Sequence, residues 1–163
     1  MPSIIHNSYT LHRETMDGSS PEVDIPGLTS TTYVDSAVVN GETYKYSVVS
    51  VDLAGSSAAT VGVCATPADP GVAPPSAPTG LTAATSSNYW VELAWSSSPG
   101  ALRYNVCLDG VPLVSVVTTD YSLQEILGVP PYDTFTIPTW SVTAVNAGGE
   151  SGPSNPVSPV PQP

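Results

Sequence analysis

A twelve-residue pattern occurs twice in this chain, and it constrains the fold more than any other feature. Residues 46–57 read YSVVSVDLAGSS, and residues 140–151 read WSVTAVNAGGES, with five positions identical at one constant offset. In each copy apolar residues alternate before a turn of small residues, which is typical of a strand with one buried face. A repeat this long in 163 residues predicts two copies of one β-module.

Charge excludes two large classes of partner. The chain has 3 Lys+Arg against 14 Asp+Glu, a formal net charge of −11, and only 10% charged residues. Nucleic-acid binding depends on neutralising phosphates with Lys and Arg, so no nucleic-acid partner is expected. An anionic membrane surface is disfavoured for the same reason, and no apolar run is long enough for membrane insertion. A neutral-polar, acidic surface suits an exposed, soluble particle or a secreted protein.

The N-terminus and the cysteines give weaker indications. Residues 1–8 contain no basic region followed by a long apolar stretch, so no export signal is expected. We therefore read Met1 either as a true start of a chain not exported by that route, or as part of a fragment. Cys64 and Cys107 do not make a disulfide framework, and strand alternation is expected to point both sulfur atoms outward. They are either reduced or joined in a disulfide that crosses between modules.

No window shows an apolar period of 3.6 residues, so the chain is predicted to be all-β. Turns are expected at Asp17-Gly18, Asn40-Gly41 and Asp109-Gly110. Strands are predicted in the first module at 9–13, 23–25, 31–34, 44–51 and 60–66, and in the second at 81–85, 89–95, 102–108, 111–117, 121–127, 134–145 and 156–158.

Proline divides the chain into four parts. These are a first module at 1–66, a Pro-rich linker at 67–77, a second module at 78–158 and a Pro-rich tail at 159–163. Proline lacks the amide donor that a sheet interior needs, and Pro-rich linkers act as semi-rigid spacers. The two modules are therefore expected to be held apart.

The second module resembles a fibronectin type III module over 78–158. The pattern consists of PTGL at 78–81, VELAW at 91–95, YNV at 104–106 and WSVTAVN at 140–146, followed by GES at 149–151. This resemblance implies a seven-stranded sandwich of two sheets. Pro138 occupies the place of the family's tyrosine corner, and Trp140 or Tyr132 is expected to compensate.

The first module resembles only the later two-thirds of the same family, so the fold class is two immunoglobulin-like (fibronectin type III) sandwiches, the first incomplete. Tyr9 corresponds to Tyr104, and Tyr44 falls at the tyrosine corner, but no counterpart of Trp95 exists. Missing strands leave apolar surface and a strand edge uncovered. Three explanations are open: residues 1–8 cover the gap with Ile4 and Ile5, a partner adds a strand, or the module is cut at a boundary.

No catalytic, cofactor or metal site is expected, so the chain is interpreted as a protein without enzymatic activity. The two histidines, His6 and His12, have only scattered carboxylates nearby in the sequence, and no nucleophile elbow is present. Asp120, Glu125 and Asp133 could supply a carboxylate pair, but they fall in irregular loops and indicate such a site only weakly. Trp90 lies at odd spacing from Trp95, so it is expected to point outward. It then either stacks on a sugar or lies in an interface, or it covers the sandwich edge or the linker.

The resemblance implies a structural or interaction role. The expectation is an exposed component of a phage virion, as head decoration or in the tail, contacting neighbouring subunits through the incomplete first module. Alternatives are an accessory fragment of a secreted polysaccharide-degrading enzyme and a cell-surface adhesin or filament subunit, with an extracellular or cell-surface location. Expected partners are protein subunits of a larger assembly and, as an alternative, a surface glycan. The candidate interaction residues are Ile4, Ile5 and Trp90.

Overall fold

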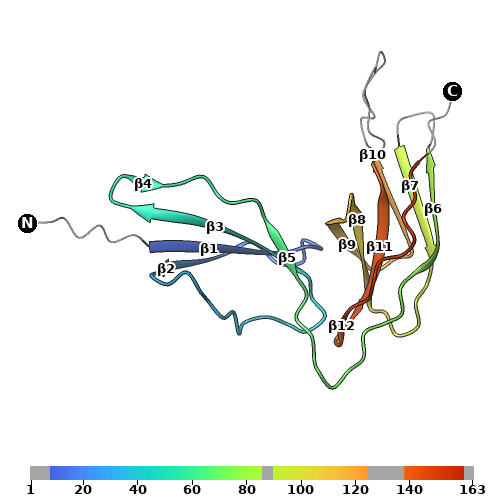
Figure 1. Ribbon diagram of the computed structural model, residues 1–163, viewed down its shortest axis with the longest axis horizontal. Helices are drawn as coiled ribbons and strands as arrows, with labels where there is room; N and C mark the ends of the chain where they lie inside the picture. The colour runs from blue at the N-terminus through green and yellow to red at the C-terminus, as the bar shows by residue number, and fades with distance from the viewer. Residues whose placement is uncertain (1–7, 86–89, 125–137, 160–163) are drawn as a thin grey trace, which may run out of the picture.

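The computed structural model describes residues 8–85, 90–124 and 138–159 (Figure 1). All regular secondary structure in these residues is β-strand, which confirms the all-β prediction. Among the described residues there is accordingly no helix able to cross a membrane. The candidate residues Ile4 and Ile5 lie outside the described ranges, as do His6, Tyr89, Glu125, Tyr132 and Asp133.

The first half of the chain forms one antiparallel sheet, called here the N-terminal sheet. Its strand order is β2-β1-β3-β4, and β5 also pairs with β3. The bounds are β1 Ser8–Thr15, β2 Val23–Leu28, β3 Tyr44–Asp52, β4 Gly55–Ser56 and β5 Val63–Ala65. Gly18, in the turn between β1 and β2, and Gly41, in the turn just before β3, adopt positive φ angles of 67° and 80°.

The second half forms two facing sheets, called here the C-terminal sandwich. One has the order β10-β7-β6 and the other the order β12-β11-β8-β9. The bounds are β6 Thr79–Thr85, β7 Trp90–Ser96, β8 Arg103–Leu108, β9 Val111–Val116, β10 Asp120–Gln124, β11 Trp140–Asn146 and β12 Gly149–Glu150. The core between the sheets contains Leu81, Val91, Leu93, Trp95, Tyr104, Val106, Trp140, Val142 and Ala144.

The sequence repeat is also a repeat of topology. Strands β3 and β11 carry the repeated pattern, and the order β4-β3-β1-β2 matches β12-β11-β8-β9 strand for strand. The registers agree as well, because Leu11 pairs with Val48 as Val106 pairs with Val142. The N-terminal sheet therefore copies one sheet of the sandwich. Within the described residues, no counterpart of β10-β7-β6 covers it.

The predicted strand at 31–34 does not form, and the repeat explains why. In chain order these residues correspond to β10, which lies between β9 and β11 and pairs only with β7 among the described strands. No described strand of the N-terminal sheet is a counterpart of β7, so residues 31–34 pair with no strand in the part of the chain that the structure describes. All four are exposed, and they form part of an irregular segment between β2 and β3. The strand predicted at 156–158 is reduced to a single bridge between Val157 and Trp140.

The linker does not hold the two halves apart, contrary to expectation. Its backbone hydrogen-bonds to both sides: Gly41 N donates to Pro67 O at 2.8 Å, and Asp69 N donates to Ala147 O at 2.7 Å. The Asn146 side chain also donates to Ala73 O at 3.0 Å. Proline still keeps the linker out of the sheets, but its remaining polar groups fix it along the C-terminal sandwich.

The outer face of the β8–β11 sheet is buried as well, because the N-terminal sheet packs end-on against it. Tyr104, Asn105, Val106 and Cys107 are consecutive and all buried. The Asn105 side chain donates to Thr43 at 3.0 Å and to Glu150 at 2.9 Å. Cys107 thus lies on the outer side of its sheet, as alternation predicts, but it is buried there rather than exposed to solvent. Both cysteines are free thiols.

Charged groups border this contact. The Arg103 guanidinium pairs with Glu42 and, at 3.1 Å, with Asp17, both from loops of the N-terminal sheet. The Thr66 hydroxyl donates to Glu150 at 3.2 Å, which adds a third link between the halves. Ionic and hydrogen-bonding groups thus enclose the buried Asn105–Thr43 pair.

The predicted tyrosine corner is present in the first half. The Tyr44 hydroxyl accepts a hydrogen bond from the Val39 backbone N–H at 3.0 Å, and Tyr44 is buried. This is the contact that joins the corner to the strand that follows it. In the second half Pro138 is buried where the tyrosine is missing, and Trp140 is fully buried in the core.

Candidate functional site

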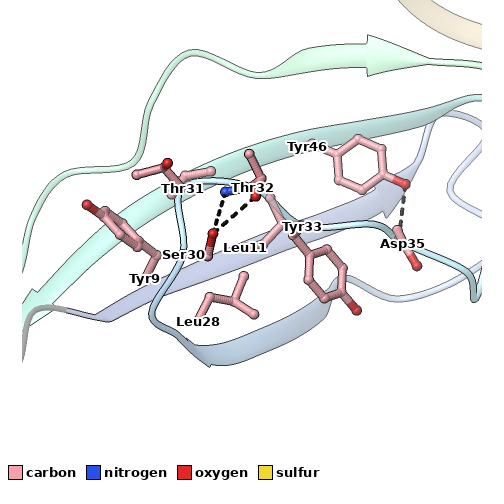
Figure 2. Close-up of a pocket in the computed structure, with 10 residues that line it drawn as sticks. Tyr9, Leu11, Leu28, Ser30, Thr31, Thr32, Tyr33, Asp35 and Tyr46 are labelled. Carbon is pink, nitrogen blue, oxygen red and sulfur yellow. Dashed lines mark hydrogen bonds between the residues drawn. The ribbon is translucent and has the colours of Figure 1, made fainter.

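A cleft of about 480 Å³ lies on the face of the N-terminal sheet that the repeat predicts to be covered (Figure 2). Strands β1, β2 and β3 form its floor, and residues 30–35 form its wall. The lining residues are Tyr9, Leu11, Leu28, Ser30, Thr31, Thr32, Tyr33, Asp35, Tyr46 and Val48.

Strand alternation places the apolar floor on one face. Tyr9 and Leu11 are two residues apart on β1, and Tyr46 and Val48 are two apart on β3, so each pair points the same way. Leu11 and Val48 are directly opposite each other, as are Val106 and Val142 in the sandwich. Both members of the sandwich pair are fully buried, whereas both members of the N-terminal pair remain partly exposed.

A polar cluster closes one end of the cleft. The Arg13 guanidinium pairs with Asp35 at 2.7 Å and lies over the Tyr44 ring at 5.3 Å. Asp35 also accepts a hydrogen bond from the Tyr46 hydroxyl at 3.1 Å (Figure 2). Burial raises the pKa of Tyr46 to about 12, and its hydrogen bond to Asp35 adds to the effect. The charged groups at this end of the cleft therefore already have partners within the chain. The apolar end is the part of the cleft that a ligand can contact.

The chemistry of the cleft is that of a binding surface. Its lining consists of aliphatic and aromatic side chains with hydroxyl groups on the wall, and its one carboxylate, Asp35, is already held by Arg13 and Tyr46. Such a lining binds through apolar contact, with hydroxyls to fix orientation. Sequence reasoning anticipated an uncovered face here but did not identify the Leu11–Val48 pair. Their pairing in the same register as Val106 and Val142 is the signal that identifies them.

The structure gathers three possible metal ligands on the opposite face of β1. His12 pairs with Asp24 across the β1–β2 ladder, and Glu22 lies two residues before Asp24 on the same side. The Nδ1 atom of His12 is 2.6 Å from Asp24 and 3.0 Å from Glu22. Their donor atoms all lie within 4.8 Å of one another, so the group could hold a metal ion. The sequence suggested scattered carboxylates, because the β1–β2 register is not visible in it.

Trp90 lies at the start of β7 and is 36% exposed, while Val91, Leu93 and Trp95 on the same strand are buried. The predicted outward orientation of Trp90 is thus present. It lies on a different sheet from the cleft, so the structure does not bring the two together. Asp120, the described member of the predicted carboxylate group, begins β10.

The arrangement of strands defines the class of protein: an immunoglobulin-like β-sandwich preceded by a second, incomplete sandwich of the same order. No protein-family model matches this sequence, and no curated protein matches it. A solved Fn3-like protein from Clostridium thermocellum is 31% identical, with 55% of this chain and 96% of that chain covered and a TM-score of 0.42. This chain belongs to the fibronectin type III family.

Two tandem structures also match. A segment of two fibronectin type III domains from chicken tenascin is 17% identical, covers 96% of this chain and 87% of its own, and has a TM-score of 0.39. The FN1–FN3 domains of chicken CNTN1 are 13% identical, with 93% of this chain and 53% of that chain covered, at a TM-score of 0.39. Modules of this kind are typical of surface and interaction proteins.

Proposed function

We propose that this chain is a non-catalytic structural or interaction protein that binds a polypeptide segment of a neighbouring subunit in the cleft of the N-terminal sheet. The observation that carries the proposal is the partly exposed Leu11–Val48 pair, at positions whose counterparts Val106 and Val142 are fully buried. One sheet of a sandwich is thus formed and the apolar surface of its inner face is left accessible.

Energetics favour an occupant. Covering apolar surface contributes about 25 cal/mol per Å², so each ~100 Å² of apolar lining that an occupant covers contributes roughly 2.5 kcal/mol. That amount is a substantial fraction of the stability of a small domain. The N-terminal sheet is held by its ladder and by its contact with the sandwich, but the described residues do not supply the second layer that domains use to bury such a face.

For the setting, we propose the exposed surface of a virion, where neighbouring subunits supply the segment. The net charge of −11 and the scarcity of Lys and Arg support an exposed position, because such surfaces resist non-specific association. Labelling intact particles with an antibody against the C-terminal sandwich tests this setting. Labelling of secreted material or of the cell surface alone would assign the chain to an extracellular location instead.

Binding by the cleft is tested with the full chain and two matched variants. Leu11→Asp places a carboxylate on the cleft floor, whereas Leu53→Asp makes the same change at a side chain that is 89% exposed in the β3–β4 turn. We expect the wild-type chain to bind anilinonaphthalene sulfonate and to self-associate in light scattering, because its cleft is accessible. Leu11→Asp should lose both properties and Leu53→Asp should retain both.

The contrary result is equally clear. If the wild-type chain is a monomer that binds no dye, and the amides of β1 and β3 are all protected from exchange, the cleft is closed by the chain itself. Residues 1–7 would then be the segment that covers it, and the proposal of a partner would be wrong.

A further inference from the structure

We infer that the segment bound in this cleft is an antiparallel β-hairpin with apolar residues at alternate positions, built like β6–β7; this inference rests on the proposed function. The C-terminal sandwich provides the template, because its sheet β12-β11-β8-β9 has the strand order and register of the N-terminal sheet. In the sandwich this sheet is covered by strands β10, β7 and β6. Those strands therefore indicate what kind of segment fits over the N-terminal sheet.

In the template, strand β7 supplies alternate buried residues. The burial of β7 alternates without a break, with Val91, Leu93 and Trp95 buried and their neighbours exposed. Strand β6 adds Leu81 to the same core. A single extended segment would cover only part of the floor, since neighbouring strands lie about 4.8 Å apart and the template uses two of them side by side. The occupant is accordingly a pair of strands.

Tyr9 specifies one contact in detail. Its counterpart Tyr104 meets the Trp95 ring edge-on, with centroids 5.5 Å apart. The Tyr104 hydroxyl also accepts the Ser98 backbone N–H at 2.9 Å, just beyond the end of β7. The Tyr9 hydroxyl makes no hydrogen bond to any residue within the described ranges. A hairpin built like β6–β7 would bring both an aromatic ring and a backbone N–H to Tyr9.

The segment at 31–34 specifies the pairing edge. Its counterpart β10 pairs with β7, with Tyr121 opposite Leu93. All four residues of the segment are exposed, and Val34 is 86% exposed, so the segment is accessible to a neighbour. The Thr32 N–H donates to the Ser30 hydroxyl at 3.2 Å and would exchange this bond on pairing. The second strand of the bound hairpin would pair with this segment and convert it to a strand, which is β-augmentation.

The Arg13–Asp35 pair limits the extent of the hairpin. In the sandwich the counterpart of Arg13 is Leu108, which packs against the core. Arg13 is instead paired with Asp35 from the irregular segment. The apolar positions of the hairpin therefore lie over Tyr9 and Leu11, and polar residues are expected where it approaches Arg13.

The inference is tested with a variant of the full chain that carries a second copy of its β6–β7 hairpin. A copy of residues 78–97 is joined in front of Met1, so that residues 1–7 connect it to Ser8. From the end of the copied β7 to Ser8 this connection has eight residues, residue 97 of the copy and residues 1–7, against the six residues 97–102 that connect β7 to β8 in the sandwich. Because loop-closure entropy changes slowly with length, the connection is long enough to let the copy fold back over the cleft.

Amide exchange at residues 31–34 reports the expected pairing. In the extended chain we expect exchange at alternate residues of this segment to slow by about a hundredfold, as in a formed ladder. Dye binding should disappear at the same time. The matched control is the same extension with aspartate in place of both Val91 and Leu93 in the copy, which should leave exchange fast and dye binding intact.

The outcomes separate the two proposals. An extended chain that remains folded, still binds the dye and shows fast exchange at 31–34 would overturn the hairpin inference while leaving the cleft as a binding surface. If the extension misfolds, a separate peptide of residues 78–97 is added to the wild-type chain. Slowed exchange at 31–34 then supports the inference, and unchanged exchange at saturating peptide overturns it. Failure of the unextended wild-type chain to bind the dye would contradict the proposed function instead.

Discussion

The side-chain amide of Asn105 donates a hydrogen bond to the Thr43 hydroxyl at 3.0 Å, across 62 residues of sequence. Both residues are almost completely buried. The bond joins the outer face of β8 to the residue just before β3, and so connects the two halves of the chain. Because water does not reach it, removal of either partner would leave a buried polar group unsatisfied.

Asn105→Ala should lower the free energy of unfolding by about 1–3 kcal/mol, because Thr43 and Glu150 lose a shared donor in a buried place. Urea denaturation measures the change. Asn155→Ala is the matched control, since Asn155 is exposed, and it should change stability little. Equal effects of the two variants would show that the buried pair does not stabilise the contact between the halves.

Gly148→Ala should displace the linker from the sandwich. A Cβ atom at Gly148 would lie 2.3 Å from the Val72 carbonyl oxygen, which belongs to backbone and cannot move without the linker. We expect faster amide exchange at Asp69 and a larger radius of gyration in small-angle scattering. Gly152→Ala has open space around its Cβ and serves as the control. An unchanged linker in Gly148→Ala would contradict the close contact.

Acid should weaken the polar end of the cleft. Burial alone would raise the pKa of Asp35, but hydrogen bonds from Arg13, Ala37 N–H and Tyr46 outweigh it and lower the pKa. A carboxyl with a lowered folded-state pKa stabilises the fold above its unfolded-state pKa, and this stabilisation is lost as pH falls through the folded-state pKa. Asp35→Asn should remove this part of the acid sensitivity. Denaturation curves between about pH 2 and 6 would detect it, and identical pH profiles would contradict it.

The Cys107 thiol should react far more slowly than that of Cys64. Burial raises the pKa of both thiols, that of Cys107 to about 11, where the negative charge of Glu150 adds to the effect. Thiolate is the reactive form, and a thiol with so high a pKa contains little of it at about pH 8, so its reaction is slow. Reaction of the Cys64→Ser and Cys107→Ser chains with a disulfide reagent measures each thiol separately. Both should react alike in denaturant, and equally fast reaction in the native state would contradict burial of Cys107.

Residue patterns were sufficient to predict the strands whose pairing partners are present in the described part of the chain. The repeat located β3 and β11, the alternation of β7 placed Trp95 inside and Trp90 outside, and Tyr44 marked the corner. The same patterns misplaced residues 31–34, because a sequence shows strand propensity but not whether a neighbouring strand exists. Local alternation was enough to predict the fold class, whereas the state of residues 31–34 depended on a neighbouring strand that the described residues do not supply.

The candidate site was less accessible to sequence reasoning. Asn105 and Cys107 occupy positions that alternation assigns to solvent, and only the end-on contact of the N-terminal sheet buries them. The gathering of His12, Glu22 and Asp24 likewise depends on the β1–β2 register. These features arise between elements, and the period-2 pattern of one strand carries no information about them.

The hydrogen-bonded linker has a consequence for any assembly of this protein. The linker is bonded to Gly41 on one side and to Ala147 on the other, and the Asn105–Thr43 bond fixes a third point. Together with the Arg103–Asp17 ion pair and the Thr66–Glu150 hydrogen bond, these attachments oppose a hinge motion between the halves. Copies of the chain anchored through their sandwiches would therefore present their clefts in one common direction, as an ordered array rather than as independently swivelling binding sites.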